Sequence, residues 1–212
     1  MSAKQLPYLI VYGVVILSLS HLLDFPIAGI FRPEHQSQSD LFKLFRCWGF
    51  LGTWVLITIS AQLLSQPTSS KPLTGWKRYL NQEAWMLIAA PIISGSIAEI
   101  IKLIVRRIRP HGDPSYIFRS WLDRPFSTSG IGFPSSHTAV AFAGSTIIIY
   151  LYPRLKLPAI IMAAGCLVTR VVSGAHYFSD GIGGALVGIS AGFLCIWLSS
   201  FVKKPGNSVR SC

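Results

Sequence analysis

The chain has 212 residues, of which 51% are hydrophobic and only 13% are charged, and its mean hydropathy is +0.50. A soluble domain carries about 25% charged residues, so too few polar side chains are present here to cover one. The apolar residues also gather in blocks close to the roughly 20 residues that cross a bilayer as a helix. This composition excludes an ordinary cytosolic enzyme, a disordered chain and a collagen-like chain, and it predicts an integral membrane protein.

The formal net charge is +11 and the isoelectric point is near 9.9. The basic residues lie at the ends of apolar blocks and in short connections, as expected for cations that flank membrane segments. They do not form one stripe, so we expect no nucleic-acid partner. The four cysteines are scattered, which indicates neither a disulfide framework nor a zinc site.

Six apolar blocks predict an all-α bundle of six transmembrane helices, forming a single domain over residues 1–212. In chain order the blocks cover residues 6–23, 47–64, 84–105, 135–152, 159–173 and 181–201. A turn from Leu41 at the membrane interface could precede the second block. In the last block Gly184, Gly188 and Gly192 recur every four residues, which favours close packing inside the bundle over a dimer interface.

The connections between the blocks fall on two sides of the membrane. One side holds residues 24–40, 106–134 and 174–180. The other side holds the N-terminus, residues 65–83, residues 153–158 and the tail from residue 202. When three cations that belong to motifs are set aside, Lys and Arg favour the second side by nine to seven. The positive-inside rule therefore predicts that the second side is cytoplasmic.

A first motif closes the third block with four cations, between Lys102 and Arg109-Pro110. Lys102 and Arg109 are seven residues apart, so two helical turns would place them on one face. Pro110 disfavours helix at Arg109, whose side chain is expected to leave the helix end. Taken alone, snorkelling cations at a membrane boundary explain this run about equally well, and Glu99 could neutralise part of it.

A second motif, Pro134-Ser135-Ser136-His137, opens the fourth block. A Pro-Ser start is typical of a helix N-terminus, where free N–H groups attract an anion such as phosphate. His137 would then lie in the first turn, over the same anion. Taken alone, a capped helix with an incidental histidine is the commoner explanation.

A third motif runs from Thr169-Arg170 through His176 to Asp180. Arg170 lies within or at the end of a predicted span, where a cation is costly and usually functional. His176 and Asp180 are four residues apart, so the carboxylate could hold one imidazole nitrogen and leave the other free as a nucleophile. Without Arg170, such a pair would more often be structural.

The three motifs together resemble the signature of the type 2 phosphatidic acid phosphatase superfamily, which reads KX6RP, then PSGH, then SRX5HX3D. Their order and internal spacings match over residues 102–180. Two positions depart from the pattern: Ser136 replaces a glycine and Thr169 replaces a serine. The six-helix arrangement also resembles the membrane branch of this family, with the active site at the extracytoplasmic ends of helices 3 to 6.

The resemblance implies a role for each motif residue. The phosphate would be bound by Lys102, Arg109, Ser135, Ser136 and Arg170. The catalytic residues would be His176 as the nucleophile that forms a phosphohistidine, Asp180 as its orienting partner and His137 as the acid and base. Because three cations can stabilise the transferred phosphoryl group and no carboxylate cluster suits Mg²⁺, we expect a metal-independent enzyme without a cofactor.

The expected function is a membrane lipid phosphatase that hydrolyses a phosphate or diphosphate monoester, in a bacterial inner membrane with an extracytoplasmic active site. Undecaprenyl diphosphate, phosphatidylglycerol phosphate, phosphatidic acid and lipid A exemplify the substrate class. The connection over residues 106–134 is too short for a soluble cap, so the site would open at headgroup depth. A phosphotransferase of the same fold and a non-enzymatic six-helix transporter remain as alternatives.

Five residues of that connection suggest contacts with such a lipid. Trp121, Phe126 and Phe133 could meet its acyl or prenyl portion, and Arg119 and Arg124 could meet headgroup charge. Simple anchoring at the interface explains the same five residues equally well.

Overall fold

A computed structural model describes residues 6–30, 39–64, 82–110 and 115–202. Within these ranges the chain is helical, as expected, and its only β-type pairings are two isolated bridges. The elements are α1 (Leu6–Ile30), α2 (Asp40–Trp48), α3 (Leu51–Leu64), α4 (Gln82–Val105), α5 (Ser136–Leu151), the 3-10 turn η4 (Pro153–Leu155), α6 (Lys156–Val172) and α7 (Phe178–Val202).

Four stretches in the described part of the chain are long and apolar enough to cross a membrane: Val11–Ile30, Trp85–Val105, Pro153–Val172 and Phe178–Phe201. A fifth span results if α2 and α3, which meet at an angle of 75°, are counted as one broken helix. The remaining predicted span corresponds to α5, an apolar helix of 16 residues. The count of six spans therefore stays a prediction that depends on α5 and on the α2–α3 pair.

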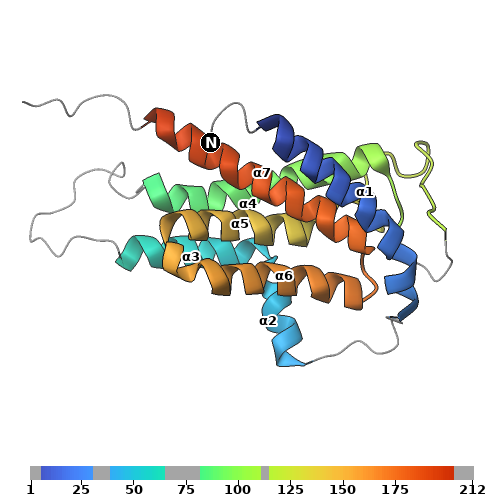
Figure 1. The fold of residues 1–212 in the computed structure, drawn as a ribbon, viewed down its shortest axis with the longest axis horizontal. Helices are drawn as coiled ribbons and strands as arrows, with labels where there is room; N and C mark the ends of the chain where they lie inside the picture. The colour runs from blue at the N-terminus through green and yellow to red at the C-terminus, as the bar shows by residue number, and fades with distance from the viewer. Residues whose placement is uncertain (1–5, 31–38, 65–81, 111–114, 203–212) are drawn as a thin grey trace, which may run out of the picture.

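Helix α5 lies at the centre of the bundle, in contact with α4, α6 and α7 (Figure 1). The α7 backbone approaches the α5 backbone most closely at the three glycines of α7. A Cβ atom on Gly184 would lie 2.4 Å from the carbonyl oxygen of Ser135, and one on Gly188 would lie 2.3 Å from that of Ala139. The glycine stripe therefore packs α7 against α5, which confirms the intramolecular interpretation.

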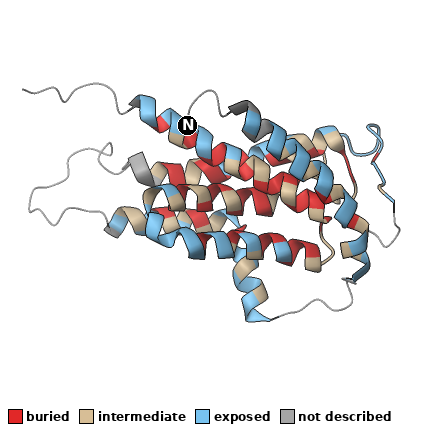
Figure 2. Cartoon of the chain, viewed as in Figure 1, coloured by how far each residue is buried: buried red, intermediate tan, exposed pale blue. Residues whose placement is uncertain are grey.

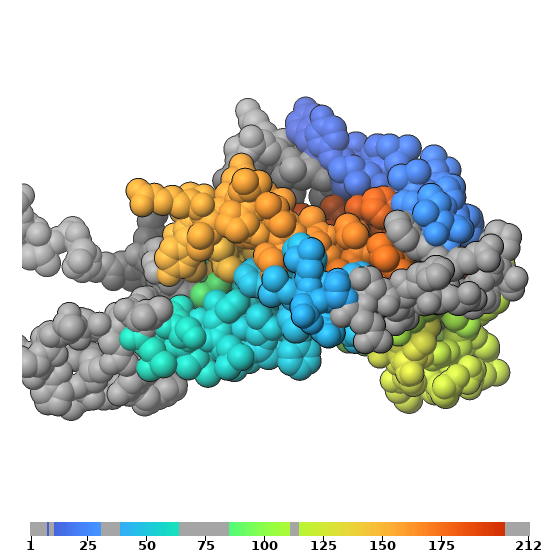
Figure 3. Space-filling view, turned by 90° about the horizontal axis from the view of Figure 1, so that it is seen from below, coloured from blue at the N-terminus to red at the C-terminus, as the bar shows by residue number. Residues whose placement is uncertain are grey.

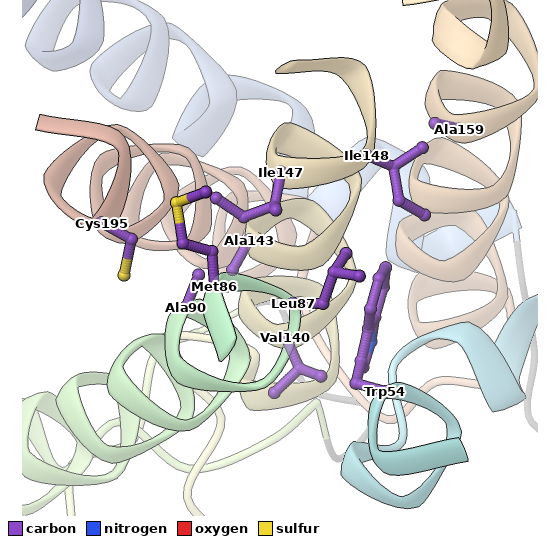
Figure 4. Packing of buried hydrophobic residues seen from close by; sticks show 10 residues of the cluster. All are labelled: Trp54, Met86, Leu87, Ala90, Val140, Ala143, Ile147, Ile148, Ala159 and Cys195. Atoms are coloured by element: carbon purple, nitrogen blue, oxygen red, sulfur yellow. The ribbon is translucent and has the colours of Figure 1, made fainter. Parts of the chain in front are cut away.

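The buried apolar residues form a core between α3, α4, α5, α6 and α7 (Figure 4). Trp54 is fully buried there, and its indole N–H donates to the carbonyl oxygen of Trp48 over 2.9 Å. Exposed residues, many of them large and apolar, occupy the outward faces of the helices (Figure 2). Leu22 and Leu56, for example, are 71% and 67% exposed, as expected for a surface that faces lipid.

Two helix boundaries differ from the predicted ones. The first helix continues past residue 23 to Ile30, so Asp24 lies inside a helix and not in a connection. Its charge is tolerated because its carboxylate accepts the N–H of Ser179 over 2.7 Å. The expected turn from Leu41 is a separate helix, α2, which Ser39 caps by accepting the N–H of Phe42.

Candidate active site

The three motifs meet at one end of the bundle, because neighbouring helices run in opposite directions. This end collects the last turns of α4 and α6, the first turns of α5 and α7, and the turn between α6 and α7 (Figure 1). These elements carry the predicted site residues Lys102, Ser135, Ser136, His137, Arg170, His176 and Asp180. Arg109 lies in the non-helical segment after α4, which ends at Val105, so the expectation that two helical turns place it on one face with Lys102 is wrong. The structure thus brings together residues that are up to 78 positions apart in the chain (180 − 102).

His176 and Asp180 form the predicted pair. The Nδ1 atom of His176 lies 3.5 Å from Oδ2 of Asp180, and both side chains are buried. The same oxygen accepts the backbone N–H of Tyr177 over 2.9 Å, and the Asp180 carbonyl accepts the N–H of Ser135 over 2.9 Å. Nδ1 therefore faces the Asp180 carboxylate without completing a hydrogen bond, and Nε2 lies on the other side of the imidazole ring.

A glycine makes room for this pair. A Cβ atom on Gly132 would lie 2.7 Å from Oδ2 of Asp180, so a larger residue there would displace the carboxylate. The Gly132 N–H is fixed by a 2.7 Å hydrogen bond to the carbonyl oxygen of Arg107.

Burial sets the protonation state of His176. Loss of solvent lowers the pKa of His176 below its usual range, because the charged imidazolium is disfavoured inside the protein. Asp180 opposes this effect, whereas Arg170 and Arg109 reinforce it by charge repulsion. His176 is therefore neutral at neutral pH, the state in which an imidazole nitrogen is nucleophilic.

Lys102 is held by the two polar groups nearest to its ammonium. Its Nζ atom lies 2.6 Å from Oε1 of Glu99 and also donates to the hydroxyl oxygen of Ser136, which in turn donates to Glu99. Glu99 therefore does neutralise part of the cation cluster. The hydroxyl of Ser136, which replaces the family's glycine, joins this triangle.

Ser135 caps α5 in an extended conformation, with φ −74° and ψ 112°. Its hydroxyl oxygen accepts the hydroxyl of Thr138 over 3.0 Å, and its side chain is fully buried. Ser135 therefore contributes to the start of α5 through its backbone and internal hydrogen bonds.

His137, Arg109 and Arg170 lie around the same point. His137 is within electrostatic range of Arg170, His176 and Lys102, and Arg109 is within range of Arg170 and His176. The Nε atom of Arg170 is buried with no hydrogen-bond partner in the described part of the chain. A buried guanidinium donor in this position fits an incoming phosphate oxygen.

The α2–α3 corner packs against His137. A Cβ atom on Gly49 would lie 2.6 Å from the His137 carbonyl oxygen and 2.7 Å from Sγ of Cys166. One turn earlier on α2, the exposed side chain of Arg46 is within electrostatic range of both His137 and Arg170. Sequence reasoning missed Arg46, because nothing in the sequence shows that α2 folds back over α6.

Sequence reasoning also missed Asp24 and Arg107, which lie behind Asp180. Arg107 pairs with Asp180 through Nη2 and with Asp24 through Nη1. One sequence signal could have found Asp24: a lone acid directly after an apolar block. Nothing in the sequence distinguishes Arg107 from the other cations of the run in which it stands.

The loop over residues 115–130 is built around two buried arginines. Arg106, with φ 59°, donates to the carbonyl oxygens of Arg119, Ser120, Asp123 and Pro125. Arg119 donates to those of Ser127 and Ser129. The expectation that Arg119 meets a headgroup is therefore wrong, because its guanidinium is used inside the loop.

The apolar residues predicted to meet the lipid, within the connection over residues 106–134, divide into two sets. Phe133 lies under the guanidinium of Arg107, 4.9 Å from its ring centre, and a Cβ on Gly183 would lie 2.7 Å from it. Phe133 is thus part of the site's support. Trp121, Leu122 and Phe126 are 62%, 94% and 90% exposed, on a loop that stands out from the body (Figure 3).

Among the residues that the structure describes, no three His, Cys, Asp or Glu side chains gather closely enough to hold a metal ion. The positive charge at the site comes from Lys102, Arg109 and Arg170. Such a set of cations beside a neutral histidine suits an anionic, phosphate-bearing ligand.

Comparison with known proteins agrees with this chemistry. A family model described as PAP2 superfamily matches residues 83–204. A lipid A 1-phosphatase of Rhizobium etli is 32% identical over 181 residues, which cover 81% of this chain and 75% of that protein. A lipid A 1-phosphatase of Porphyromonas gingivalis is 35% identical over 85 residues, 38% of this chain and 19% of that longer protein.

The fold is also similar to a solved structure. The transmembrane PAP2-type phosphatidylglycerolphosphate phosphatase of Bacillus subtilis superimposes with a TM-score of 0.60 and 18% identity, over 93% of this chain and 96% of that one. At this identity the likeness concerns the fold.

Proposed function

The chain belongs to the PAP2 superfamily, and from this premise we propose that it is an integral membrane lipid phosphatase acting through a phosphohistidine. The observation that carries the proposal is the buried pair of His176 and Asp180. Arg109 and Arg170 lie within electrostatic range of His176, and Lys102 lies within range of Asp180. A transporter would need none of these residues in this arrangement.

In the first step, Nε2 of His176 attacks phosphorus, an N–P bond forms, and the bond from phosphorus to the lipid oxygen breaks. His137 donates a proton to the departing oxygen. Lys102, Arg109 and Arg170 hold the three non-bridging oxygens, whose charge they stabilise in the transition state. Asp180 stabilises the positive charge that develops on the His176 ring.

In the second step, a water molecule attacks phosphorus from the side the lipid has left. His137 takes a proton from that water, the N–P bond breaks, and inorganic phosphate leaves with His176 restored. A hydroxyl acceptor in place of water would make the same enzyme a phosphotransferase. Both reactions use the same residues, so the acceptor that reaches the phosphohistidine decides between them.

The proposed substrate is a lipid phosphate or diphosphate monoester. Two observations support a lipid: the relatives named lipid A 1-phosphatases, and the apolar, exposed side chains of Trp121, Leu122 and Phe126 on the loop at the catalytic end. The exposed Arg46 of α2, on the same end, suits further anionic groups of such a headgroup. Among the lipid classes named above, the relatives favour lipid A.

A substrate panel tests this proposal. Lipid A, undecaprenyl diphosphate, phosphatidylglycerol phosphate and phosphatidic acid are compared with glucose 6-phosphate by kcat/KM in mixed micelles. We expect at least one lipid to exceed the sugar phosphate by two orders of magnitude or more, about the gain from burying a few methylene groups. A sugar phosphate that equals every lipid would contradict the lipid assignment.

Metal removal has a definite expected result. Because Lys102, Arg109 and Arg170 supply the positive charge, phosphate release should continue at an unchanged rate in excess EDTA. Orthovanadate, which mimics the transferred phosphoryl group, should inhibit it. Loss of activity in EDTA with recovery on adding Mg²⁺ would mean that a metal takes part.

We further propose that the catalytic end faces the extracytoplasmic side of a bacterial inner membrane. In a background without native cysteines, a cysteine at the exposed Ser129 should react with an impermeant maleimide in intact cells. A cysteine at the exposed Arg154, in η4 at the other end, should react only after the cells are opened. The reverse pattern would invert the topology.

A further inference from the structure

Arg107 lies between two carboxylates in the interior. Asp24 and Asp180 are fully buried, and Arg107 is 3% exposed. Its Nη2 atom pairs with Oδ1 of Asp180 and donates to the Ser179 hydroxyl over 2.8 Å, and its Nη1 atom lies 3.6 Å from Oδ2 of Asp24. The guanidinium is enclosed by the aromatic rings of Tyr116, Phe133 and Tyr177, at 4.9–5.3 Å from their centres.

Asp24 is also fixed by hydrogen bonds. Its Oδ1 accepts the Ser179 N–H over 2.7 Å, and its Oδ2 accepts the hydroxyls of Ser179 and of Tyr116, the latter over 2.8 Å. Burying a charge costs several kcal/mol unless it is paired and hydrogen-bonded, and Asp24 meets both conditions. These contacts connect α1 to the first turn of α7.

The pairing fixes the orientation of the Asp180 carboxylate. An aspartate turns readily about its last torsion, because that torsion has broad, two-fold preferences. Arg107 holds Oδ1, which leaves Oδ2 directed at the Tyr177 N–H and at Nδ1 of His176. The direction in which His176 presents Nε2 therefore depends on Arg107.

The net charge of this network also suits the positive charge that develops on the His176 ring. Two carboxylates and one guanidinium carry a net charge of −1 next to the imidazole. When His176 is phosphorylated on Nε2 while Nδ1 keeps its proton, the ring becomes positive. The surplus negative charge lies where that positive charge appears.

We propose that Asp24 and Arg107 are positioning residues that hold Asp180, and through it His176, in the orientation for attack on phosphorus. The proposal rests on the proposed function, since it needs His176 to be the nucleophile. It assigns part of the catalytic support to α1, which lies outside the region that the family model matches.

The first test measures kcat and KM of the full-length protein in detergent with p-nitrophenyl phosphate. Asp24→Asn and Arg107→Lys should each lower kcat about 10- to 100-fold and leave KM unchanged. Losses of this size are typical when a residue that orients a reacting group, without touching the substrate, is replaced. Ser179→Ala keeps every charge and should give a smaller loss of the same kind. Ser94→Ala, which removes a buried hydroxyl of α4 away from the site, is the matched control and should match the wild type.

A double-mutant cycle separates positioning from general destabilisation. In an Asp180→Asn background, Asp24→Asn and Arg107→Lys should have almost no further effect on kcat, because the residue through which they act is already altered. The proposal would be overturned if each variant lowered kcat in the Asp180→Asn background by the same factor as in the wild type. It would also be overturned if KM rose in proportion to each loss of kcat.

A measurement without turnover keeps the two proposals distinguishable. In protein labelled with ¹⁵N-histidine, His176, assigned with a His176→Gln variant, should show a single tautomer protonated on Nδ1. Ser179→Ala and Asp24→Asn should convert it to a mixture of tautomers. An unchanged tautomer in both variants would overturn the positioning role, whereas absent phosphatase activity on every substrate would count against the proposed function alone.

Discussion

His176→Ala should reduce phosphate release by at least about four orders of magnitude, since the variant has no nucleophile to receive the phosphoryl group. Cations and His137 alone would have to activate water directly, a reaction for which the site is not arranged. The measurement is release of phosphate from the best lipid of the panel, with retention of helicity and monodispersity in detergent as the test of folding. His176→Asn, whose side chain is closer in size to histidine, should show the same loss of activity. That result would show that the loss does not come from a cavity left by alanine.

A control and a direct trap accompany this variant. Ser200→Ala removes an exposed hydroxyl near the C-terminal end of α7, which donates to the Trp197 carbonyl oxygen over 2.6 Å, and it should leave turnover close to wild type. Rapid alkaline quenching with ³²P-labelled substrate should capture an acid-labile phosphoenzyme in the wild type and none in His176→Ala. Near-normal turnover of His176→Ala would disprove the phosphohistidine mechanism.

His137→Ala should lower activity by about 10²- to 10⁴-fold with an alkyl phosphate, whose leaving alkoxide needs a proton. With p-nitrophenyl phosphate the loss in the first step should be far smaller, because p-nitrophenolate leaves without one. The measurement is the rate of phosphoenzyme formation across a series of leaving groups. The slope against leaving-group pKa should be steeper in the variant.

Equal losses for good and poor leaving groups would contradict the role of His137 as the acid. The position of His137 allows good and poor leaving groups to be compared without a change in the protein backbone. Its ring is in the first turn of α5, and its backbone is fixed by the Gly49 corner on one side. Truncation of the ring therefore should not shift the helix.

The sequence predicted the helices of the bundle because they depend on local patterns, and the same patterns group the candidate site residues near helix ends. Apolar blocks specify α4 to α7 to within a few residues, and the spacings from Lys102 to Asp180 specify which side chains share a helix end. The glycine stripe of α7 was assigned to packing for the same reason: a four-residue repeat defines one face.

The remaining features depend on contacts between distant segments, which no local pattern encodes. An acid normally ends an apolar helix, so the sequence places Asp24 in a connection. Its burial depends on the distant residues Arg107, Tyr116 and Ser179, which pair with its carboxylate or donate hydrogen bonds to it. Arg106, Arg107 and Arg109 are nearly adjacent, yet their surroundings differ. Arg106 donates to carbonyl oxygens of the loop over residues 115–130, Arg107 pairs with Asp180, and Arg109 lies within electrostatic range of His176. For Arg119 the sequence favours a headgroup contact and interfacial anchoring equally, because hydrogen bonds to loop carbonyls leave no trace in the sequence.

The central position of α5 has a consequence for how substrate gains access. Nine of its sixteen residues are buried, most of them small, and it is enclosed by α4, α6 and α7. A helix so confined cannot tilt without breaking three interfaces at once, so the N-terminal end of α5, where the candidate site lies, is held in one position. We expect any opening to involve the rim, namely α2 and the loop over residues 115–130, and hydrogen exchange should be far faster in α2 than in α5.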